Sequence, residues 1–130
     1  MRRRQDGQAT VELVLVLPVV VLALLLVIQV ALVARAQIVV VEAAREGARA
    51  AAVERTEVAA TAAVVRTLGL PRGCAPAEVS IGGGQGGIAT VTVECRVPTD
   101  VPLVGPLLGD PVVEASSAML VEDPADAAGG

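Results

Sequence analysis

Few residues in this chain have side chains suited to catalysis. The sequence contains no histidine, lysine or tyrosine, so the usual general base and the commonest metal ligand are missing. Ser80, Ser116 and Ser117 have no candidate base to activate them. Asp100 and Asp110 lie in a proline-rich stretch, where carboxylates are ordinarily solvated. We therefore expect no enzymatic activity, no cofactor, no metal site and no small-molecule substrate.

The two cysteines are the remaining reactive groups. Cys74 precedes one expected strand and Cys95 ends the next, so a hairpin would bring them near each other. Outside the membrane such a pair favours a disulfide, and closing a loop of about 20 residues would stabilise the fold by roughly 3 kcal/mol. Two free, buried thiols are the alternative. The spacing does not fit a C-x-x-C redox motif.

A carboxylate, Glu12, stands where a long apolar run begins. Residues 13–34 carry no charge and a single amide. At about 1.5 Å per residue this run spans about 33 Å, close to the hydrocarbon thickness of a bilayer. The sequence therefore predicts a transmembrane helix over residues 8–34, with 13–34 as its apolar core and a kink at Pro18. Taken alone, Glu12 also fits a plain interfacial carboxylate near a helix N-terminus.

The distribution of arginine predicts the direction of this helix. Arg2, Arg3 and Arg4 precede the span with only Asp6 against them, whereas arginines and glutamates balance after it. The positive-inside rule then places the N-terminus in the cytoplasm and the C-terminal region outside a cell membrane that the chain crosses once. A signal peptide cleaved after Ala36 is the alternative, but its apolar core would usually have only about 7–15 residues.

The N-terminal segment resembles a known family. "DGQATVELVLVLPVVVL", residues 6–22, is similar to the N-terminus of the TadE-like proteins, which are pseudopilins of the tight-adherence (Flp-type) pilus system. "VVVEAAREGARAAAV", residues 39–53, is similar to the segment after the span. In type IV pilins a prepilin peptidase cuts after a glycine, and a glutamate stands fifth in the mature chain. The resemblance therefore implies a basic leader over residues 1–7, cleavage between Gly7 and Gln8, and a role for Glu12 in assembly.

This resemblance implies a pilin-like membrane subunit (a minor pilin or pseudopilin) of a tight-adherence (Tad/Flp) pilus assembly machine. Its expected partners are the lipid bilayer, a prepilin peptidase, other pilin-like subunits and pilus assembly proteins. An unprocessed, single-pass, membrane-anchored extracytoplasmic module with a binding or structural role is the alternative. Nucleic acid is not an expected partner, because the net charge is -4 and no aromatic ring is present for base stacking.

Beyond the membrane the sequence predicts a helical region over residues 35–68. We expect a break near residues 54–56 and a stop at Gly69. Small and apolar residues form a stripe along the first part of this region: Ile38, Val41, Ala44, Ala48 and Ala52. The stripe fits either an ordinary solvated helix or a packing face for a sister subunit.

The character of the chain changes after the helices. Residues 74–122 predict a small antiparallel β region, in which residues 88–95 alternate between two faces. The expected fold is thus α+β: a long N-terminal transmembrane helix that continues outside the membrane, a second short helix, and a small antiparallel sheet of about three strands. Residues 123–130 are expected to be a disordered tail.

Overall fold

The computed structural model describes residues 3–69, 73–83, 86–99, 102, 105 and 109–121, with the backbone alone for residues 3–6 and 77. The elements follow in the order α1 (Arg3–Glu54), α2 (Glu57–Leu68), β1 (Cys74–Ile81), β2 (Ile88–Arg96) and β3 (Val112–Leu120). This confirms the predicted α+β fold with two helices and a small antiparallel sheet. The expected disordered tail lies outside the described residues, as do the first two residues of the expected leader.

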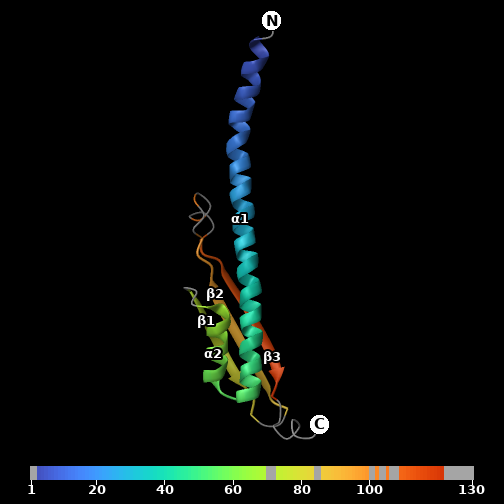
Figure 1. Ribbon diagram of the computed structural model, residues 1–130, viewed down its shortest axis with the longest axis vertical. Helices are drawn as coiled ribbons and strands as arrows, with labels where there is room; N and C mark the ends of the chain where they lie inside the picture. The colour runs from blue at the N-terminus through green and yellow to red at the C-terminus, as the bar shows by residue number, and fades with distance from the viewer. Residues whose placement is uncertain are drawn as a thin grey trace.

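Helix α1 dominates the shape of the molecule. It has 52 residues and runs on without interruption through Pro18, which gives it a length of roughly 78 Å. Its N-terminal half projects away from the rest of the chain, and its C-terminal half lies against α2 and the sheet (Figure 1). We call the C-terminal half of α1, together with α2 and the sheet, the head.

A short turn at Arg55 and Thr56 separates the two helices. Arg55 follows α1 with a positive φ of 54°, and Thr56 then adopts an extended conformation. The Thr56 hydroxyl accepts a hydrogen bond from the backbone N–H of Ala59 at 3.3 Å, which caps the start of α2. At the other end Gly69 has a φ of 72°, a left-handed conformation that glycine adopts without steric cost.

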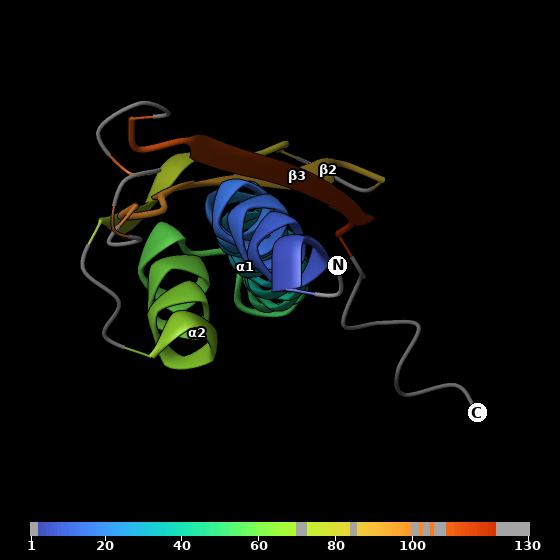
Figure 2. The same cartoon turned by 90° about the horizontal axis from the view of Figure 1, so that it is seen from above.

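The sheet has the order β1-β2-β3 with both pairs antiparallel. Burial alternates along the central strand: Ala89, Val91, Val93 and Cys95 are buried, whereas Ile88, Glu94 and Arg96 are exposed. This is the alternation that the sequence predicts. Both helices pack on the same face of the sheet, so the head has two layers (Figure 2).

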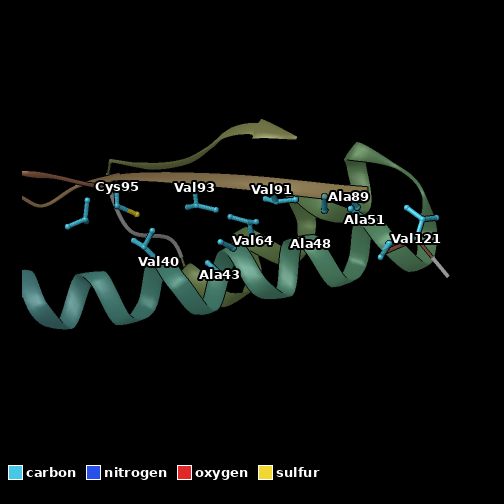
Figure 3. Close-up of a cluster of buried hydrophobic side chains, with 14 residues drawn as sticks. Val40, Ala43, Ala48, Ala51, Val64, Ala89, Val91, Val93, Cys95 and Val121 are labelled. Atoms are coloured by element: carbon cyan, nitrogen blue, oxygen red, sulfur yellow. The ribbon is translucent and has the colours of Figure 1, made fainter. Parts of the chain in front are cut away.

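The core of the head lies between these layers and is built without aromatic rings (Figure 3). Val40, Val64, Val91 and Val93 are its largest fully buried side chains. The small-residue stripe on α1 faces this core, since three of its members are completely or almost completely buried: Ala44, Ala48 and Ala52. For these three alanines both sequence-based interpretations are wrong, because the head of the same chain covers them. Ile38, by contrast, is 65% exposed.

Candidate assembly interface

The N-terminal part of α1 is exposed along its length. Every residue from Gly7 to Leu24 is exposed, including Leu13, Leu15 and Leu17, which keep more than half of their surface accessible. The helix is long and apolar enough to cross a membrane, and none of its most apolar stretch is buried. So large an exposed apolar surface is unfavourable in water and marks a membrane-anchored helix.

The residues of the expected processing site all lie at the start of this uncovered segment. Gly7 and Gln8 belong to the first turns of α1, and no atom beyond the helix lies within 4 Å of the point where a Cβ on Gly7 would sit. Glu12 follows Gln8 by four residues, which places both on one helix face. The Glu12 side chain is exposed and is therefore accessible to a neighbouring molecule.

Pro18 lies inside α1, about 1.7 turns beyond Glu12. Proline has no backbone N–H, so the carbonyl of Val14 lacks its usual helical donor. In a membrane helix such a carbonyl is ordinarily satisfied by a neighbouring group. The kink expected at Pro18 stays a prediction.

Gln29 marks the point where the head reaches the apolar segment. It is only 4% exposed, and its Nε2 donates a hydrogen bond to Oγ1 of Thr99 at 3.4 Å. Its Oε1 atom is buried and has no hydrogen-bond partner in the described part of the chain. The sequence shows Gln29 as a lone amide in an apolar run, and that isolation is the signal that could have indicated a contact.

Thr99 belongs to a structured loop neck, which we define as residues 97–99 and 109–111 between β2 and β3. The N–H of Val97 donates to the carbonyl of Pro111 at 2.9 Å. Thr99 donates twice, from its N–H to Oδ1 of Asp110 at 3.1 Å and from its hydroxyl to the carbonyl of Gly109 at 2.5 Å. The Asp110 carboxylate was expected to be only solvated. It also accepts a hydrogen bond that holds the two sides of the loop neck together.

The two cysteines form a disulfide, so the alternative of two free thiols is wrong. Cys74 is the first residue of β1 and lies directly opposite Cys95 in the register of the sheet. The bond lies close to residues 32–40 of α1, with which it lines a groove. It is therefore far from Gly7 and Glu12, and the structure does not bring these two groups of predicted residues together.

Comparison with known proteins supports the sequence resemblance. Residues 7–49 match the family model described as TadE-like protein. The match covers about a third of the chain, from the predicted cleavage glycine through most of α1, and does not extend into α2 or the sheet. No curated protein and no solved structure shows a significant match to the chain. Over residues 7–49 the chain is thus similar to a family of pilin-like proteins associated with tight-adherence pili.

Proposed function

We propose that this TadE-like chain is a pilin-like membrane subunit of a tight-adherence pilus assembly machine, processed after Gly7 and assembled through α1. The observation that carries the proposal is the segment from Gly7 to Leu24, in which every residue is exposed and Glu12 lies near the start. In the bilayer, lipid surrounds this segment. In an assembly, the same segments of other pilin-like subunits replace the lipid.

Cleavage gives Glu12 a specific partner. Removal of residues 1–7 creates a cationic amine on Gln8, four residues before Glu12. A carboxylate surrounded by lipid is costly unless it is paired. Pairing of Glu12 with the Gln8 amine of a neighbouring subunit therefore favours one axial register between adjacent helices.

Gly7 suits the cleavage step for a conformational reason. The bond between Gly7 and Gln8 lies within α1, so a peptidase has to unwind the first turns to reach it. Glycine weakens a helix by about 1 kcal/mol relative to alanine, which favours local unwinding at this position. The basic leader keeps these turns on the cytoplasmic side, where we place the prepilin peptidase.

The intact mass of the full chain, purified from membranes with and without the host's prepilin peptidase, tests the proposal. We expect a peptidase-dependent loss of Met1–Gly7, and retention of the leader in a Gly7→Leu variant. A chain that keeps its leader when the peptidase is present would instead be an unprocessed, anchored extracytoplasmic module. Mass is preferable to N-terminal sequencing because an N-terminal Gln8 can cyclise and block the degradation.

The pairing role of Glu12 is tested separately. Glu12→Ala and Glu12→Gln both remove the charge, and we expect both to reduce incorporation into pilus complexes at unchanged membrane levels. Glu46→Gln is the matched control, because Glu46 is also exposed on α1 but lies in the head. Normal assembly of both Glu12 variants would show that the pairing role is wrong.

A further inference from the structure

An open groove runs between α1 and the end of the sheet where the disulfide lies. Its volume is about 230 Å³. Helix α1 contributes Leu32, Arg35 and Ala36 to its lining, and the opposite side consists of Arg96 at the end of β2 with Val97 and Pro98 of the loop neck. The groove is thus mostly apolar with an arginine on each side.

The position of the groove along α1 places it at the surface of the bilayer. Arg35 is the first charged residue after the uncharged run of residues 13–34. The loop neck touches α1 at Gln29, six residues earlier, which corresponds to about 9 Å along the helix. The loop neck therefore contacts α1 inside its uncharged run, before the first charged residue, Arg35. Leu32 lies between these two points, on the apolar side of Arg35.

The two arginines of the groove give it a positive charge. Arg35 and Arg96 are both exposed, and neither forms an ion pair with a described residue. An ion pair does form farther along α1, between Arg45 and Glu42. Two guanidinium groups near an apolar groove at a membrane surface complement a phosphate attached to acyl chains.

We propose that this groove binds an anionic phospholipid of the leaflet that borders the head. Arg35 and Arg96 hold the headgroup phosphate, and an acyl chain lies along the apolar wall at Leu32. The disulfide between Cys74 and Cys95 forms part of the groove lining and fixes its shape. The proposal requires α1 to cross a bilayer but is independent of cleavage after Gly7, so the mass measurement above can fail without affecting it.

The chain contains no aromatic residue, so a single introduced tryptophan is a unique fluorescent reporter. Pro98 lines the groove from the loop neck and is exposed. The full-length Pro98→Trp protein is reconstituted into vesicles of phosphatidylcholine and phosphatidylglycerol, with bromine on the chains of one lipid or the other. We expect phosphatidylglycerol to be enriched about fivefold or more near the tryptophan, relative to its share of the bilayer. This is the size of effect that the attraction of one arginine to an anionic membrane surface would give.

Two controls distinguish a lipid bound in the groove from lipid that merely lies near the protein. Ala118→Trp places the reporter on an exposed position of β3, where we expect no quenching by either lipid. In the Pro98→Trp background, Arg35→Gln with Arg96→Gln is expected to abolish the preference for phosphatidylglycerol. The matched pair Arg45→Gln with Arg49→Gln removes the same charge from exposed α1 positions farther from the span and is expected to leave the preference unchanged.

Native mass spectrometry of the protein with no introduced tryptophan provides a second readout, in case Pro98→Trp disturbs the loop neck. We expect a phosphatidylglycerol molecule to remain bound to the wild-type chain and to be lost from the Arg35→Gln, Arg96→Gln variant. Equal quenching by both lipids, or equal loss of preference in the Arg45, Arg49 pair, would overturn the proposal. So would a wild-type chain that retains no phospholipid.

Discussion

At the scale of single residues, Gly47 decides how closely α1 and α2 approach. A Cβ at this position would lie 2.6 Å from Cγ2 of Val64 and 3.0 Å from Cγ1 of Val91. Gly47→Ala gains about 1 kcal/mol of helix propensity but overpacks the core, which typically costs about 1–3 kcal/mol. We therefore expect a net lower free energy of unfolding of the head, measured by circular dichroism during chemical denaturation in detergent.

A double-mutant cycle attributes this effect to the proposed contact. Gly47→Ala is expected to cost less in a Val64→Ala background, where the Cγ2 atom that it meets is absent. An equal cost in both backgrounds would show that the contact with Val64 is not the cause, and a Gly47→Ala chain more stable than the wild type would contradict the prediction itself.

At the scale of elements, the disulfide holds the end of the β1–β2 hairpin. It closes a sequence separation of 21 residues, for which the chain-entropy model gives about 3 kcal/mol. The head core includes Cys95 itself and contains no aromatic side chain, so we expect reduction to lower the midpoint of thermal unfolding markedly. Circular dichroism with and without a reductant measures the shift, and the Cys74→Ala, Cys95→Ala variant is the control, because reductant should not change its midpoint.

At the scale of the whole molecule, α1 has two different halves. Its N-terminal half is apolar and exposed, and its C-terminal half forms part of the head core. The arginine-rich N-terminus predicts that the head lies outside the cell membrane. In cells that lack the prepilin peptidase, so that the leader stays on the chain, trypsin added to intact spheroplasts is then expected to remove an epitope fused after residue 130 and to spare one fused before residue 1. The opposite pattern, at equal membrane integrity, would reverse the orientation.

The sequence by itself was enough to predict features that depend on neighbouring residues. An uncharged run over residues 13–34 predicts a membrane helix wherever the head lies, because length and hydropathy are local properties. The alternation over residues 88–95 likewise predicted the two faces of β2 correctly. The resemblance of residues 6–22 and 39–53 indicated the family that the comparison also found.

The tertiary structure alone decided which surfaces meet. The sequence left open whether the small-residue stripe of α1 faces solvent or a sister subunit, and the fold covers its three alanines with the head of the same chain. Gln29 meets Thr99 across 70 positions of sequence, and Arg35 shares a groove with Arg96 in the same way. Local periodicity shows which face of an element is apolar, but the partner of that face depends on how the chain returns to it, and therefore on packing between distant segments.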